Sequence, residues 1–115
     1  MKVFRIENSN GTGPYRHSEI GIELCRIHSG IPKHPAPFDD RDSNGKHLIN
    51  FLWQDRSYIF GFSSLEQLLA WFLDELELLA QHEFVVSVYE SSQVVCGNFQ
   101  VIFIRESGPV ETIKL

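Results

Sequence analysis

The sequence contains few cysteines, because only Cys25 and Cys96 occur in its 115 residues. Two widely separated cysteines lack the paired spacing of a zinc site and make a poor disulfide framework. A free cysteine commonly packs as a small hydrophobic side chain. We therefore expect both cysteines to be reduced and buried, as in a cytoplasmic protein.

Basic residues are also scarce. Ten lysines and arginines stand against fifteen carboxylates, which leaves a net charge of −5. Binding to phosphate backbones needs clustered basic side chains, and here they are scattered. The balance argues against direct nucleic-acid binding and favours a basic protein surface as the partner. An alternative interpretation is that the mild acidity only serves solubility.

Long apolar runs are missing as well. No stretch approaches the roughly 18 consecutive apolar residues that a membrane span requires. The start of the chain, from Met1 to Arg5, turns polar too early for a secretory signal. We therefore expect no membrane association and a location in the cytoplasm.

What the sequence does contain is the composition of a globular domain. Hydrophobic residues make up 43% and charged residues 22%, close to globular averages, and the length fits a single domain, 1–115. Residues 30–46 depart from this pattern, since Pro32, Pro35 and Pro37 prevent regular structure. A loop of this length is often functional, and it could equally be an insertion without a role.

Much of the remaining chain has the alternation and the β-branched or aromatic content of strands. The predicted strands are 2–7, 48–53, 57–62, 84–90, 93–96, 99–105 and 110–114. Residues 17–29 fit either a strand or a helix, and we favour a short helix. Gly97-Asn98 predicts a two-residue type II′ hairpin turn between 93–96 and 99–105.

The clearest element is an amphipathic helix from about Leu65 to Gln81. Ser63 with Glu66, or Ser64 with Gln67, can form a capping box at its start. Its apolar face is wide and regular, and consists of Leu65, Leu68, Leu69, Phe72, Leu76 and Leu79. The sequence therefore predicts an α+β fold: a mostly antiparallel sheet of about five to six strands, with one long amphipathic helix packed on it and room for a second short helix.

Residues that could carry chemistry do not combine into a committed motif. Asp40 and Asp42 match oxygen-ligand positions in the first half of a calcium-binding loop. The position at which such a loop carries a bidentate glutamate is occupied by Phe51. His34 and His47 bracket the acidic loop, without the spacing of a helical zinc pair. We therefore predict no catalytic residue, no metal and no cofactor.

The flank of the helix beyond its leucine face is the most testable functional feature. Trp71 and Leu78 lie off the main apolar stripe, among several carboxylates. Aromatic anchors are enriched at protein interfaces, which predicts a partner-binding surface made of Glu66, Trp71, Asp74, Glu75, Glu77 and Leu78. The alternative is that a second core layer or the edge of the sheet covers these residues.

Several segments resemble small proteins carried by bacteriophages and prophages. The similar segments are Phe4-Arg5-Ile6-Glu7-Asn8-Ser9-Asn10-Gly11-Thr12-Gly13-Pro14-Tyr15, Phe60 to Leu68, Trp71-Phe72, Val88-Tyr89-Glu90 and Gln100 to Phe103. The resemblance covers the two ends and the middle of the chain but not the loop at 30–46, and it assigns no activity. Small acidic phage proteins are often inhibitors of host defence systems or host enzymes. The resemblance thus implies a host protein or complex as the partner.

The opening strand with Arg5 and the ending with Gln100 also resemble ADP-ribosyltransferases. Those enzymes place an early Arg or His on a strand and a late Glu near the nicotinamide ribose. The late position here would be Glu90 or Glu106, and the chain is short for that fold. This resemblance implies an alternative function, that of a small enzyme using a nicotinamide cofactor.

Our leading hypothesis is a non-enzymatic phage-type protein that masks a host protein through its acidic and aromatic face. The host protein could belong to a defence complex of the kind that anti-CRISPR proteins inhibit, in the cytoplasm of the bacterial host. A third hypothesis is an accessory protein that forms a dimer through an exposed strand.

Overall fold

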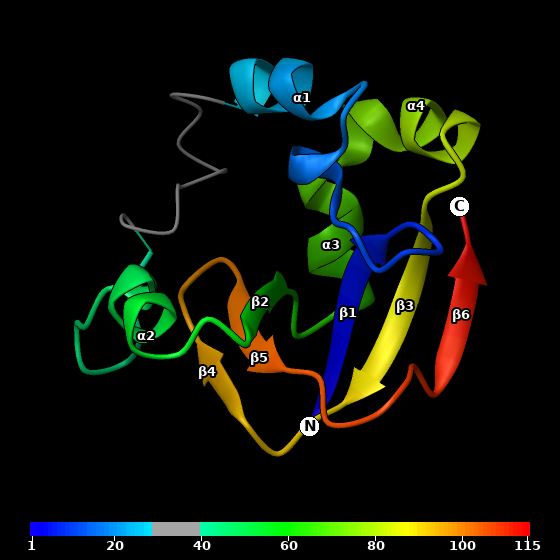
Figure 1. Ribbon diagram of the computed structural model, residues 1–115. Helices are drawn as coiled ribbons and strands as arrows, with labels where there is room; N and C mark the ends of the chain where they lie inside the picture. Colours follow the sequence, from blue (N-terminus) through cyan, green and yellow to red (C-terminus); the bar gives the residue numbers. More distant parts are fainter. Residues whose placement is uncertain (29–39) are drawn as a thin grey trace.

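The computed structural model describes residues 1–28 and 40–115, which form two three-stranded antiparallel sheets with helices around them (Figure 1). The first sheet has the order β1-β3-β6 and consists of β1 (Lys2–Glu7), β3 (Val85–Glu90) and β6 (Glu111–Lys114). The second sheet has the order β2-β5-β4 and consists of β2 (Tyr58–Gly61), β5 (Val101–Ile104) and β4 (Val94–Cys96).

The two sheets meet at a backbone bridge between Phe4 and Phe62. The N–H of Phe4 donates to the carbonyl of Phe62 at 2.8 Å, and the N–H of Phe62 donates to the carbonyl of Phe4 at 2.7 Å. Phe62 directly follows β2, so the chain passes from the second sheet to the edge of the first just before the next helix begins. The bridge therefore fixes the start of that helix beside β1.

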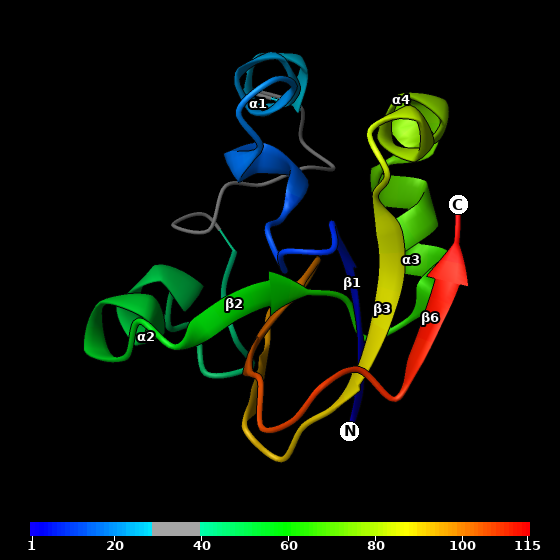
Figure 2. The same ribbon diagram turned by 45° about the vertical axis from the view of Figure 1, so that its right-hand side comes forward.

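The helical segments of the described chain are short. They are η1 (Pro14–Arg16), α1 (Gly21–His28), α2 (Leu48–Gln54), α3 (Leu65–Trp71), η2 (Leu73–Glu75) and α4 (Leu76–Gln81), where η marks a 3₁₀ turn. Figure 2 shows α3 and α4 together on one side of the first sheet, behind β3 and β6, whereas α2 lies apart beside β2. The segment from α3 to α4 thus covers one face of the first sheet.

Strand alternation gives the first sheet an apolar face and a polar face. On the apolar face, Ile6 and its register partner Val86 are buried against Leu68, Phe72 and Leu79 of the helices. Burial of such side chains stabilises the fold by roughly 1.5–3 kcal/mol each before entropy is counted. This explains why the leucine-rich segment packs here.

The opposite face of the first sheet is apolar only at one end. There Val3 and Tyr89 form a second cluster with Val101 and Phe103 of β5, in which each side chain is at most 3% exposed. This cluster holds the two sheets together. The other end of the same face carries charged side chains, which form one of the two candidate sites described below.

The α+β class is confirmed, but the predicted architecture is wrong. The chain forms two sheets rather than one, and the expected long helix from Leu65 to Gln81 is divided into α3, η2 and α4. The backbone leaves helical geometry at Phe72 (φ −105°, ψ 17°) and at Glu75 (φ −113°, ψ 4°). A 3₁₀ turn is tighter than an α-helical turn, and the two residues just before it, Trp71 and Phe72, are both buried.

Residues 48–53 also differ from the prediction, because they form helix α2 rather than a strand. Leu48 is fully buried at the start of this helix, whereas Trp53 is 72% exposed near its end. A short, continuous apolar run does not distinguish a strand from a helix by its periodicity. The strand prediction relied on that run alone.

The remaining strand predictions and the short helix are confirmed, since β1 to β6 and α1 lie within the predicted ranges. The hydroxyl of Ser64 accepts the N–H of Gln67 at 3.1 Å, which confirms Ser64 as the N-cap. The side chain of Gln67 binds the Ser63 hydroxyl and the Phe99 carbonyl, so the reciprocal half of the predicted capping box is not formed there. Both cysteines are exposed, so the expectation that they are buried is wrong. Most of the predicted loop at 30–46 lies outside the described residues.

The β4–β5 turn has the predicted length but is shifted by one residue. The N–H of Gly97 donates to the carbonyl of Gln100 at 2.8 Å, which continues the register of the two strands. The two turn residues are therefore Asn98 and Phe99, rather than Gly97 and Asn98.

Candidate functional site

The first candidate site is an exposed surface on α3, η2 and α4. Of the predicted partner-binding residues, Glu66, Asp74 and Glu77 are exposed. Leu73 directly precedes Asp74, stands four positions before Glu77, and is 63% exposed. We call Glu66, Leu73, Asp74 and Glu77 the acidic helical surface. The sequence interpretation missed Leu73, although this leucine lies outside the regular apolar stripe.

The other predicted partner-binding residues face inward. Trp71 is 8% exposed, and its indole Nε1 donates to the hydroxyl of Tyr15 at 2.6 Å. Glu75 is 7% exposed, and Leu78 is half-buried against the helical core. Trp71 and Glu75 are thus interior residues, as the alternative interpretation of this flank held. The fully exposed members of the predicted surface are the three carboxylates.

The charge around the acidic helical surface is strongly one-sided. Residues 57–104 contain six carboxylates and no lysine or arginine, whereas the rest of the chain contains ten basic and nine acidic residues. The formal charge of −6 in this segment therefore exceeds the net charge of the whole chain. Among the described residues, no basic group forms an ion pair with Glu66, Asp74 or Glu77, so these carboxylates keep their attraction for an external basic surface.

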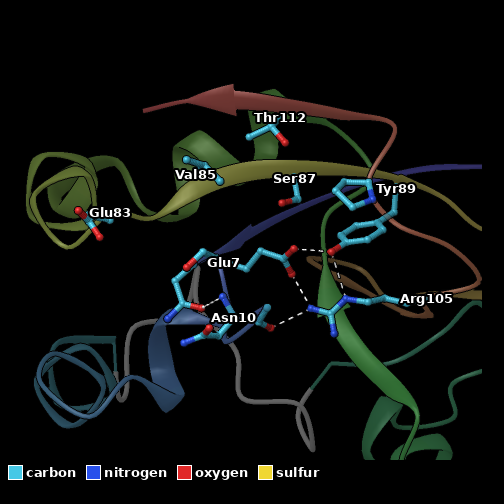
Figure 3. A pocket seen from close by; sticks show the side chains of 12 residues that line it. Glu7, Asn10, Glu83, Val85, Ser87, Tyr89, Arg105 and Thr112 are labelled. Carbon is cyan, nitrogen blue, oxygen red and sulfur yellow. Dashed lines mark hydrogen bonds and ion pairs between the residues drawn. The ribbon is translucent and has the colours of Figure 1, made fainter.

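The second candidate site is a network of charged side chains centred on Glu7, on the polar face of the first sheet (Figure 3). Glu7 is only 4% exposed. Its Oε1 accepts from Arg5 Nε at 2.9 Å and from Arg105 Nη2 at 2.5 Å, and its Oε2 accepts from the hydroxyl of Tyr89. We call these four residues the Glu7 network. It brings together residues from β1 and β3 and the residue that follows β5.

Both arginines of the Glu7 network also donate hydrogen bonds to backbone carbonyls of neighbouring segments. Arg5 Nη1 donates to the carbonyl of Phe60 in β2 at 2.7 Å. Arg105 Nη2 donates to the carbonyl of Gly11 at 2.8 Å, and Arg105 Nε donates to the Tyr89 hydroxyl at 3.1 Å. The network thereby connects both sheets with the turn after β1. A charged group that makes several hydrogen bonds in this way is held in one position.

Burial and hydrogen bonding act in opposite directions on the carboxyl of Glu7. Burial raises the pKa of Glu7, but hydrogen bonds from Tyr89, Arg105 and Ser87 outweigh it, so the pKa lies below its ordinary value of 4.5. Burial, followed by the hydrogen bond to Glu7, raises the pKa of Tyr89. Glu7 is therefore ionised and Tyr89 is a neutral donor near pH 7.

Glu7, Tyr89 and Arg105 of the Glu7 network line a hollow of about 540 Å³. Figure 3 shows Arg105 and Glu83 toward opposite ends of this hollow, with Glu7 between them. The formal charges of Glu7 and Glu83 cancel those of Arg5 and Arg105. Glu7 already forms ion pairs with both arginines. We interpret the network as a structural connection between the sheets.

The residues named for an ADP-ribosyltransferase do not come together. Arg5 is bound to Glu7 and Phe60, while Glu90 pairs with the amino group of Met1 at 2.6 Å. Glu90 lies opposite Lys2 in the register, and Lys2 and Arg5 alternate to opposite faces of β1. Glu106 accepts from the hydroxyls of Ser91 and Ser92. Neither glutamate therefore faces Arg5.

The calcium-like string does not form a metal site either. Asp40 is buried and bound to backbone amides, while Asp42 Oδ1 accepts the N–H groups of Asn44 and Lys46 in a tight turn. Across residues 1–28 and 40–115, no group of three or more His, Cys, Asp or Glu side chains is arranged to hold a metal ion. His34, proposed as a partner of His47, lies outside the described residues.

The relationship of the chain to known proteins agrees with the phage resemblance. The model of the family described as Bacteriophage T4 Y00F protein matches residues 1–115, the whole chain. The chain belongs to the bacteriophage T4 Y00F protein family. Comparison with curated proteins and with solved structures found no match. Membership confirms the predicted phage relationship, and within the described part of this family member no helix has the length and apolar character of a membrane span.

Proposed function

We propose that this phage protein binds a host protein in the host cytoplasm and blocks it by covering a basic patch. The observation that carries the proposal is that Leu73 is exposed on the same helical segment as the exposed carboxylates of Glu66, Asp74 and Glu77. The partner surface that complements this arrangement combines an apolar depression with lysines and arginines around it.

The two kinds of side chain make different contributions to such a complex. A leucine that becomes fully buried contributes roughly 1.5–3 kcal/mol, so Leu73 supplies affinity. Exposed carboxylates contribute mainly to the rate of encounter and to the choice of partner. A basic patch on a host protein often binds nucleic acid, and covering it would inhibit such a protein without any reaction. Components of host defence complexes are partners of this class.

The test is capture of host proteins by the purified protein and by matched charge variants. Asp74→Lys with Glu77→Lys reverses two carboxylates of the acidic helical surface. Glu23→Lys with Glu111→Lys changes the net charge by the same amount at exposed positions on α1 and β6. Leu73→Ser removes the apolar anchor without changing the charge.

We expect the parent and the control variant to capture the same partner. The charge-reversed protein and the Leu73→Ser protein should not capture it. Capture should weaken as salt is raised, because exposed charges are screened. A partner that binds the charge-reversed and Leu73→Ser proteins as well as it binds the parent would show that the acidic helical surface is not the binding site.

A further inference from the structure

Asp40 is a buried carboxylate that the Glu7 network and the acidic helical surface do not involve. It is 1% exposed, and in the described part of the chain no basic side chain forms an ion pair with it. Its carboxylate accepts four backbone N–H groups. These come from Arg41 at 2.9 Å, Asn98 at 2.8 Å, Phe99 at 3.3 Å and Gln100 at 3.1 Å. Successive backbone N–H groups aimed at one point form an anion-binding nest.

Gly97 provides an independent sign that the β4–β5 turn is built around this carboxylate. A Cβ atom at Gly97 would lie 2.6 Å from Oδ2 and 2.7 Å from Oδ1 of Asp40. A real Cβ essentially never comes this close to another heavy atom. The glycine is therefore required by the close approach of Asp40.

The turn that Asp40 holds also contacts the start of the acidic helical surface. The carbonyl of Phe99 accepts a hydrogen bond from Nε2 of Gln67 in the first turn of α3. The backbone N–H of Gln67 is the group that Ser64 caps. Glu66, the first carboxylate of the acidic helical surface, precedes Gln67. A continuous chain of contacts thus leads from Asp40 to the beginning of α3.

We propose that the β4–β5 turn is an anion-binding nest whose resident ligand is the Asp40 carboxylate, and that Asp40 thereby positions the start of α3. Asp40 acts here as a positioning residue. Only its relevance to partner binding rests on the function proposed above. The nest requires a negatively charged ligand with two acceptor oxygens, because four N–H donors converge on it.

A double-mutant cycle tests whether Gly97 and Asp40 act together. In the parent, Gly97→Ala should lower the melting temperature by roughly 10 °C, since the added Cβ displaces the carboxylate and leaves buried N–H groups unbound. Asp40→Ala should cause a similar loss. In the Asp40→Ala background, Gly97→Ala should cost less than about 2 °C, because the clash is gone. Equal costs of Gly97→Ala in both backgrounds would overturn the proposal.

Chemical rescue tests the nature of the ligand. Added acetate should refill the nest of the Asp40→Ala protein, raise its melting temperature in a saturable manner, and move the amide resonances of Asn98, Phe99 and Gln100 back toward the parent positions. Chloride at equal ionic strength is the control. An equal effect of acetate and chloride would contradict the proposal.

A milder variant keeps the test decisive if Asp40→Ala does not fold. Asp40→Asn retains the shape and one acceptor oxygen, so its melting temperature should lie below that of the parent, and the amide resonance of Gln67 should shift. An Asp40→Asn protein as stable as the parent would show that no anion is needed. These outcomes do not depend on any partner, so they can fail separately from the proposed function.

Discussion

The acidic helical surface and the Glu7 network contain the same kinds of charged group in opposite surroundings. In the Glu7 network, one buried carboxylate binds two guanidinium groups and a phenol. In the acidic helical surface, three carboxylates and one leucine are exposed, within a segment of the chain that has no lysine or arginine. Carboxylates of the first kind are already bound within the protein, whereas those of the second kind are available to another molecule.

Burial and bound partners therefore identify the charged side chains that stabilise the fold more reliably than residue type does. A residue in the Glu7 network should affect stability strongly, and a residue in the acidic helical surface should affect stability little and binding strongly.

The largest expected effect is that of Glu7→Gln. The substitution keeps the size of the side chain but leaves the guanidinium groups of Arg5 and Arg105 without their carboxylate. Removing one partner of a buried ion pair costs about 3–5 kcal/mol, and urea denaturation measures this loss. Glu90→Gln is the control, because Glu90 is exposed and its pairing with Met1 should contribute about 0–1 kcal/mol. A loss no greater than that of the control would show that the network is not a structural connection.

Trp71→Phe should have the next largest effect. The substitution removes the indole N–H that donates to Tyr15 and leaves space beside Phe62, whose ring centroid lies 5.4 Å from that of Trp71. We expect a loss of about 1–3 kcal/mol in the free energy of unfolding. A neutral effect on stability, combined with loss of partner binding, would instead place Trp71 at the interface.

The pH dependence of stability should also distinguish the two regions. Because the pKa of Glu7 is lowered on folding, its contribution is complete above its unfolded value, near 4.5, and is lost as the pH falls through the lower folded value. The difference in unfolding free energy between the parent and Glu7→Gln should therefore be constant near neutral pH and shrink below about pH 4.5. A difference that stays constant down to the acid limit of folding would contradict the lowered pKa.

The smallest effect on stability is expected for Asp74→Lys with Glu77→Lys. Exposed substitutions away from special features usually change the free energy of unfolding by about 0.5 kcal/mol or less. Because the substitutions also remove repulsion between like charges, the free energy of unfolding should stay the same or rise slightly. A loss as large as that of Glu7→Gln would mean that these carboxylates are structural.

The sequence predicted the elements whose local pattern is unambiguous. The alternation of Lys2 to Glu7 defines β1, and Ser64 with Gln67 defines the start of α3, since both depend only on residues close in the chain. The break after Trp71 was not predictable from spacing, because every residue of that segment except Asp74 is a good helix former or apolar. Trp71 and Phe72, which directly precede the break, are both buried, and tertiary packing of this kind overrides local helix propensity.

The Glu7 network could not be predicted from the sequence, for a different reason. Glu7 and Arg105 are 98 positions apart, and no local pattern indicates that such residues meet. The same holds for Asp40 and Asn98, which are 58 positions apart. For the acidic helical surface, the exposed carboxylates were predicted correctly as surface residues. The predicted surface did not include the exposed Leu73, and it included Trp71, which is buried.

The most direct test of the central claim is the affinity of a captured host partner for three purified proteins, measured by calorimetric titration. Binding through the acidic helical surface predicts that Leu73→Ser with Asp74→Lys and Glu77→Lys weakens affinity at least about tenfold. Glu23→Lys with Glu111→Lys should leave it nearly unchanged relative to the parent. Equal affinity of all three proteins would contradict the claim.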